Sequence, residues 1–388
     1  MSLTPALTPA LHWIDTPAAL EQACGTLAEA RFLALDTEFI RESSFHPIPA
    51  LIQLSAGNEV YLIDPQALEP NTALLRLLGP EGPLKLLHAC GEDLEVLSNW
   101  AGVPVAPLID TQLAQALLGE DAAMSYQRLV EYWTGDVLAK DETRSDWLER
   151  PLSEAQCRYA ALDVAYLPII WPQQREALMK QGRLEWLEAD CATLVAQAGR
   201  DPAEDNEWYR RNRQLWRLKP RATATYRQLT LWREAEVRER NMPRNWLVSD
   251  KVLFAIADAQ PRNRYELASV EGVKPTMVKR EGDMLLSIVS NTAGLSPQQL
   301  PEALPSPLTG PFKRRLKALK QVVSDKARQL GIAAEILARR RQLEELVIAD
   351  MKHLPLPLPS GWRGELLNDS FEHALCDSRV DCHAARSD

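Results

Sequence analysis

Apolar and polar positions divide the chain into two unlike halves. Between residues 28 and 64, three short apolar runs with polar borders, RFLALDTEF, ALIQLSAG and EVYLIDP, predict three consecutive β-strands. Helix and strand patterns then alternate through TALLRLLG, LKLLHA, EDLEVLSNWA, PLID and TQLAQALLG. Helical spacing over residues 126–133 and 153–180 completes this half. Strands in succession, followed by alternating helices and strands, predict a mixed α/β sheet domain.

The second half is helical and contains an internal repeat. The segment VRERNMPRNWLVSDKVLF begins at residue 237, and ARQLGIAAEILARRRQLE begins ninety positions later, at residue 327. A repeat at this spacing predicts two copies of one small helical module. Polar residues 197–206 and the five prolines of residues 293–311 indicate linkers. We therefore expect an α/β domain at 1–205, modules at 206–292 and 311–370 around a Pro-rich linker at 293–310, and a disordered tail at 371–388.

Two acids interrupt the first apolar run. Asp36 and Glu38 are two positions apart, so their side chains share one face of the predicted strand. Two like charges repel, and burying them is costly unless a cation compensates. A pair of divalent-metal ligands explains this spacing. A strand end with two solvated acids is the alternative.

Two later segments supply further candidates. Asp93 follows a strand and the Gly91 turn, in the first turn of a helix, where acids are also favoured for capping alone. Tyr159 and Asp163 are one helical turn apart, in a helix that Ser153 and Gln156 begin with a capping box. A packed Tyr beside an exposed Asp is the structural alternative there. The three segments together indicate a metal-dependent site for phosphodiester cleavage.

These motifs carry a family resemblance. DTE at residues 36–38, the later Asp93 and the Tyr159-to-Asp163 spacing resemble the DEDD superfamily of 3′–5′ exonucleases, in the subgroup with Tyr in the last motif. LIQL, LIDP, LLHACGEDLEVL and DWLERPLSEAQCRYAALDVAYL extend the likeness to the ribonuclease D family along the first half. GWRGELL at residues 361–367 resembles the end of that family, so the resemblance spans nearly all of residues 11–367. The resemblance implies a ribonuclease H-like exonuclease domain. The helical modules resemble HRDC bundles. An alternative interpretation is that these modules dock another protein.

The resemblance also implies a mechanism. Two divalent cations, Mg²⁺ or Mn²⁺, would bind Asp36, Glu38, Asp93 and Asp163, with Asp36 between them, and Tyr159 would orient the attacking water. Such a pair stabilises the attacking and leaving oxygens of an in-line displacement. The implied activity is removal of 3′ nucleotides from tRNA precursors and other small structured RNAs, releasing nucleoside 5′-monophosphates. A DNA-directed 3′–5′ exonuclease and a non-catalytic RNA-binding protein are the alternatives.

Charge is divided unevenly. The chain carries −9 overall, but residues 206–353 hold 28 Lys and Arg against 16 Asp and Glu, a net of +12, which leaves −21 elsewhere. A basic half attracts phosphates locally, although solvated helix faces also give this pattern. We expect RNA contacts from six arginines of this half: Arg210, Arg211, Arg213, Arg238, Arg240 and Arg244.

Other features limit the setting. No GxxxxGK[ST] motif occurs, so ATP hydrolysis and a helicase are unsupported. No apolar stretch is long enough for a membrane span, and the N-terminus lacks the pattern of a secretory signal. The six cysteines are scattered without a CxxC pair, which favours a reducing compartment. We therefore expect a cytoplasmic monomer.

Overall fold

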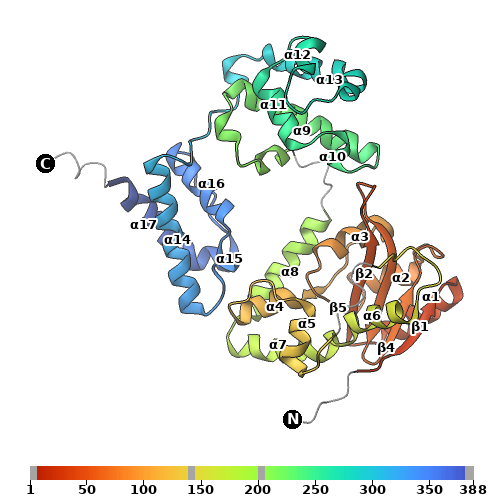
Figure 1. Cartoon of the computed structure of the whole chain (residues 1–388). Helices are drawn as coiled ribbons and strands as arrows, with labels where there is room; N and C mark the ends of the chain where they lie inside the picture. The colour runs from red at the N-terminus through yellow and green to blue at the C-terminus, as the bar shows by residue number, and fades with distance from the viewer. Residues whose placement is uncertain (1–6, 139–144, 200–205, 381–388) are drawn as a thin grey trace.

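The computed structural model describes residues 7–138, 145–199 and 206–380. An N-terminal α/β domain and two helical modules are arranged as a triangle (Figure 1). The α/β architecture and the two helical bundles expected from the sequence are confirmed.

The N-terminal domain is built on one six-stranded sheet. Its strands are β1 (Ala10–Ile14), β2 (Phe32–Ile40), β3 (Ile48–Ala56), β4 (Glu59–Ile63), β5 (Leu84–Leu87) and β6 (Leu108–Asp110). They are ordered β1-β4-β3-β2-β5-β6. The central strands β2, β3 and β4 form an antiparallel meander. Strand β1 pairs in parallel with β4, β5 pairs in parallel with β2, and β6 pairs in parallel with β5. Strand β2 is therefore a central strand, with β3 on one side and β5 on the other.

Eight helices accompany the sheet within the described part of this domain. They are α1 (Pro17–Ala28), α2 (Thr72–Leu78), α3 (Gly91–Ala101), α4 (Thr111–Leu118), α5 (Tyr126–Thr134), α6 (Glu154–Ala165), α7 (Leu167–Lys180) and α8 (Leu184–Ala198). Helix α6 packs across β2, β3 and β4, and α3 packs on β2 and β3. Thus the two helices that carry predicted site residues both lie against the strand that carries Asp36.

Three details differ from the prediction. Strand β1 and helix α1 precede the first predicted strand, and the helix expected over 153–180 is two helices that meet at Tyr166. Pro168 has no N–H with which to continue the helical hydrogen bonds of α6, but it fits the first turn of α7. The predicted capping box is present, because Ser153 and Gln156 exchange side-chain-to-backbone hydrogen bonds.

The two helical modules repeat at the predicted spacing. The first contains α9 (Pro220–Glu239), α10 (Arg244–Leu247), α11 (Asp250–Ala259), α12 (Arg264–Ala268) and α13 (Pro275–Ala293). The second contains α14 (Gly310–Leu330), α15 (Ala334–Leu337), α16 (Arg340–Met351) and α17 (Gly361–Val380). Helices α9, α10 and α11 begin ninety residues before α14, α15 and α16. The divergence lies where α12 would recur, since residues 354–360 of the second module are not helical.

The expected disordered tail is wrong for its first part. Helix α17 continues to Val380, and Phe371 and Leu375, one turn apart, are fully buried. An apolar face at helical spacing explains this packing. Residues 381–388 lie outside the described residues.

The second module shares its core with the α/β domain. Buried residues of both form one continuous apolar cluster, whereas the first module has a separate cluster. At the joint, the Trp186 and Trp362 rings stack with centroids 4.5 Å apart. Arg363 pairs with Asp190 at 2.6 Å, and the Arg183 guanidinium donates to the Leu330 carbonyl at 2.5 Å. Separate domains along the sequence are therefore one packed body here.

Within the described ranges, no helix has the length and apolarity needed to cross a bilayer.

We predict that the α/β domain and the second module unfold together. Trp362→Ala removes a ring that is only 7% exposed, so it should lower the free energy of unfolding by about 3 kcal/mol and destabilise the α/β domain as well. Trp246→Ala, whose side chain is 63% exposed, is the matched control. Denaturant unfolding measures the free energy of unfolding, and hydrogen exchange of the β2 amides measures the stability of the α/β domain. An unchanged stability of β2 in Trp362→Ala would contradict the shared core.

Candidate active site

Three carboxylates converge at the centre of the α/β domain. Asp36 and Glu38 project from β2, and Asp163 projects from α6, which crosses that strand. One oxygen from each lies within 4.8 Å of the others. The sequence prediction that these three acids form one site is thus consistent with their geometry.

Asp93 stands beside this group with a partner of its own. It lies in the first turn of α3 and is 8% exposed. Its carboxylate accepts a hydrogen bond from the Thr37 hydroxyl at 2.5 Å. Thr37 was not predicted from the sequence, because a threonine between two acids on a strand carries no distinctive pattern. This bond ties α3 to β2 and fixes the orientation of Asp93 beside Asp36.

Burial and mutual repulsion hold protons on these acids. The pKa of Asp36 lies well above its usual range because of burial, followed by the charges of Asp93, Asp163 and Glu38. Burial, with the charges of Asp163 and Asp93, raises the pKa of Glu38 to about 8. Burial raises the pKa of Asp163 to about 7 and that of Asp93 to about 6. Four acids are therefore held where their ionised forms need a compensating positive charge.

The donor set fits a hard divalent cation. Carboxylate oxygens are the ligands that Mg²⁺ and Mn²⁺ prefer, and Mg²⁺ sites in proteins use few carboxylates and retain water. Asp36, Glu38 and Asp163 supply three such oxygens, which lie close enough together to bind one ion. The cluster can hold a metal ion without rearrangement of the fold.

Tyr159 belongs to the same group. It lies one turn before Asp163 on α6, and the two side chains are close enough for each to shift the pKa of the other. Burial and the neighbouring charges of Asp163 and Glu38 raise the pKa of the phenol above its usual range. The phenol therefore remains protonated near neutrality and acts as a hydrogen-bond donor.

Two further residues, missed from the sequence, position α6. The buried Tyr126 donates its hydroxyl to the Leu162 carbonyl at 2.7 Å, directly before Asp163. Arg150 binds both oxygens of Asp64 at 2.9 and 2.8 Å and donates to the Trp147 carbonyl. The Trp147 ring lies 6.0 Å from that of Tyr159. Both depend on contacts between segments far apart in the chain, which no local pattern reveals.

Most of the six arginines expected to bind RNA contact other side chains of the protein. Arg238 and Arg244 pair with Glu234, and Arg240 pairs with Glu281. Of the remainder, Arg210 pairs with Glu207, Arg211 covers Trp208, and Arg213 is exposed. Contact with RNA stays a prediction for all six, and at least three also have an intramolecular role.

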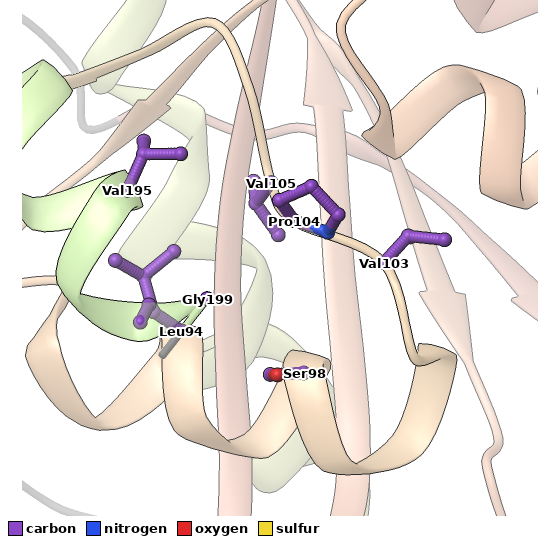
Figure 2. A pocket seen from close by; sticks show the side chains of 8 residues that line it. Leu94, Ser98, Val103, Pro104, Val105, Val195 and Gly199 are labelled. Carbon is purple, nitrogen blue, oxygen red and sulfur yellow. The ribbon is translucent and has the colours of Figure 1, made fainter. Parts of the chain in front are cut away.

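A small apolar pocket has none of the acids in its lining. Figure 2 shows it between α3, the segment that follows α3, and the end of α8. Its lining residues are Leu94, Ser98, Val103, Pro104, Val105, Val195, Ala198 and Gly199. None of them is ionisable, so this pocket lacks the groups that hydrolytic chemistry needs.

Family models match all three parts of the chain. A model described as 3′-5′ exonuclease matches residues 11–178. One described as HRDC domain matches residues 222–289, and one described as Ribonuclease D, C-terminal HRDC domain, matches residues 311–371. With the converging acids, these matches define a 3′–5′ exonuclease that carries two HRDC modules.

Full-length relatives specify the family. The chain is 39% identical over 370 residues to ribonuclease D of Pseudomonas paraeruginosa, covering 95% of this chain and 98% of the relative. It is 34% identical to ribonuclease D of Escherichia coli K12, covering 93% and 97%. The crystal structure of Escherichia coli RNase D superposes with a TM-score of 0.86 at 33% identity, over 95% of this chain and 99% of that one. The chain belongs to the ribonuclease D family, and the expected exoribonuclease class is confirmed.

We predict that pH and metal ions act on stability through these acids. Their raised pKa values mean that the folded chain without metal binds more protons than the unfolded chain, whose carboxyls titrate near pH 4. Stability without metal should then fall as pH rises from about 4, the unfolded value, to about 8, the folded value of Glu38. Calorimetry in chelator measures this fall in Tm. Mg²⁺ or Mn²⁺ competes with protons for these carboxylates. The metal should therefore raise the Tm most strongly at about pH 8, where the acids hold the fewest protons.

Asp36→Asn is the matched variant for this measurement. It removes one charge from the cluster and should reduce both the loss of Tm with pH and the gain with metal. Equal Tm changes in the two proteins would show that the pH dependence arises elsewhere.

Proposed function

We propose that the chain removes nucleotides from the 3′ ends of small structured RNAs, tRNA precursors among them, by hydrolysis that uses two divalent cations. The observation that carries this proposal is the convergence of Asp36, Glu38 and Asp163 within 4.8 Å. The Escherichia coli relative is described as an exoribonuclease involved in structured RNA processing, which supports this substrate class.

The acids divide the binding of the ions. The charges of all three other acids raise the pKa of Asp36, and Asp36 is the ligand that two ions would share. Glu38 and Asp163 would hold one ion together with Asp36, and Asp93, whose carboxylate accepts a hydrogen bond from Thr37, would help to hold the second. When bound, such ions activate the attacking water and neutralise charge on the leaving oxygen.

The Tyr159 hydroxyl orients the attacking water. Its raised pKa makes it a poor base, so hydrogen bonding is its contribution. Tyr159 and Asp163 are four residues apart on α6, so the helix itself places this hydroxyl on the same face as Asp163. Cleavage of the last phosphodiester bond releases a nucleoside 5′-monophosphate, and the shortened strand keeps a 3′-hydroxyl.

The basic half supplies the RNA-binding surface. The net charge of +12 over residues 206–353 is a property of the sequence that the internal ion pairs do not alter. Lys313, Lys317 and Lys320 are exposed along α14, at spacings that place them on one face. These lysines suit phosphate contacts at least as well as the arginines that pair with Glu234 and Glu281.

A DNA-directed exonuclease is the second candidate. The carboxylates act on a phosphodiester bond that RNA and DNA share, so discrimination depends on a contact to the 2′-hydroxyl.

A cytoplasmic location and a monomeric state also stay predictions.

Digestion of a tRNA with extra 3′ nucleotides tests the proposal. With Mg²⁺ or Mn²⁺, the protein should shorten the 3′ extension stepwise and release 5′-monophosphates, and it should act less well on a DNA strand of the same sequence. Asp36→Asn should lower turnover by several orders of magnitude while the affinity for RNA remains. Full activity in excess chelator, or equal rates on DNA, would contradict the respective parts of the proposal.

Tyr159→Phe isolates the water-positioning hydroxyl. The ring and its contact with Trp147 remain, and only the hydrogen bond is lost. We expect kcat to fall by about two to three orders of magnitude with little change in metal affinity. Single-turnover kinetics and Mn²⁺ titration measure the two quantities. An unchanged kcat would assign Tyr159 to packing alone.

A further inference from the structure

The α/β domain contacts the two HRDC modules in different ways. Its joint with the second module is a continuous apolar core. Its contact with the first module is small and polar, and it forms at the loop between β2 and β3, residues 41–47. In Figure 1 the tip of the β2–β3 hairpin points toward the first module.

Asn241 makes the central hydrogen bonds of this contact. Its side-chain oxygen accepts from the backbone N–H groups of Phe45 and His46 at 3.0 and 3.1 Å. Asn241 follows α9 with a left-handed φ of 44°, and Gly331 occupies the equivalent turn of the second module with a φ of 65°. Glycine would satisfy this backbone, but only a side-chain acceptor reaches the loop.

The Phe45 ring takes part in a series of cation–π contacts. Arg238 lies 5.1 Å from the ring centroid, and Arg244 lies 4.8 Å from it. Arg244 also lies 4.1 Å from the Trp208 ring, which Arg211 covers at 3.5 Å. Cation–π contacts of this kind are individually modest and orientation-dependent. We call Phe45, Trp208, Arg238, Asn241 and Arg244 the clasp.

A buried acid holds the arginines of the clasp in place. Glu234 is 4% exposed and accepts from the Arg244 guanidinium at 2.9 and 2.8 Å. Arg238 approaches the same carboxylate at 3.6 Å. The first module thus presents two oriented guanidinium groups to Phe45.

The loop in the clasp connects directly to the acid cluster. It continues β2, which bears Asp36 and Glu38. Near its start, Arg41 pairs with Glu95 of α3 at 2.6 Å, and α3 bears Asp93. One loop therefore links the first module to two of the three elements that carry the acids.

We propose that the clasp is a positioning device, which holds the first HRDC module at a fixed orientation to the acid cluster so that a bound RNA fold presents its 3′ strand to the site. This inference rests on the proposed function. Because the module has its own core, it keeps its fold when the clasp opens, but it loses its orientation. A module that is tethered but not oriented binds structured RNA with a larger entropic penalty.

Asn241→Gly and Asn241→Asp in the full chain test this inference. Glycine preserves the left-handed turn and deletes the acceptor, whereas aspartate tolerates the turn and retains an acceptor. Hydrogen exchange of the Phe45 and His46 amides reports the clasp itself. Steady-state kinetics on a hairpin RNA with a 3′ tail, and on the tail alone, report its effect.

For Asn241→Gly we expect faster exchange at both amides and a KM for the hairpin raised about tenfold, the effect of losing one or two hydrogen bonds. kcat and the kinetics on the tail alone should be unchanged, and Asn241→Asp should resemble the parent protein. Unchanged exchange would show that the contact does not form in solution. Faster exchange with an unchanged or lower KM for the hairpin would also overturn the inference. If the parent protein left the hairpin intact but degraded the tail, the proposed substrate would fail while the exchange data still tested the contact.

Discussion

Repulsion among carboxylates that are buried or half-buried is the constraint on which the rest of this structure depends. Four acids occupy a site where burial alone raises each pKa, and their charges raise that of Asp36 further. Such an arrangement disfavours folding in the absence of metal. The surrounding fold must therefore be stable enough to hold the acids at a separation that suits a cation.

Each acid is held by an element fixed from elsewhere. Strand β2 is central in the sheet, α3 is tied to it through Thr37, and α6 is anchored by Tyr126 and the Ser153 capping box. The second HRDC module extends the same core through Trp186 and Trp362. The first module, by contrast, packs around its own core and meets the α/β domain at the loop that continues β2. The α/β domain thus contacts the two modules in two ways, one through a shared core and one through the loop that continues β2.

Local patterns were enough to predict the acids that the fold brings together, but not the residues that hold them in place. Asp36, Glu38, Tyr159 and Asp163 were found because spacings of two on a strand and four on a helix define a shared face. Thr37, Tyr126 and Arg150 act through partners 36 to 86 positions away, so no local spacing marks them. The ninety-residue repeat predicted two modules, yet not that one would merge with the α/β core. The arginines of the first module were assigned to RNA from charge alone, because their pairing with Glu234 and Glu281 appears only in three dimensions.

Anomalous diffraction from crystals soaked in Mn²⁺ above neutral pH tests the central claim most directly. Strong peaks in contact with Asp36, with Glu38 and Asp163 around one of them and Asp93 toward the other, are the expected result. Absence of Mn²⁺ between these carboxylates, at a concentration that supports RNA hydrolysis in solution, would contradict the account of the cluster as a metal site.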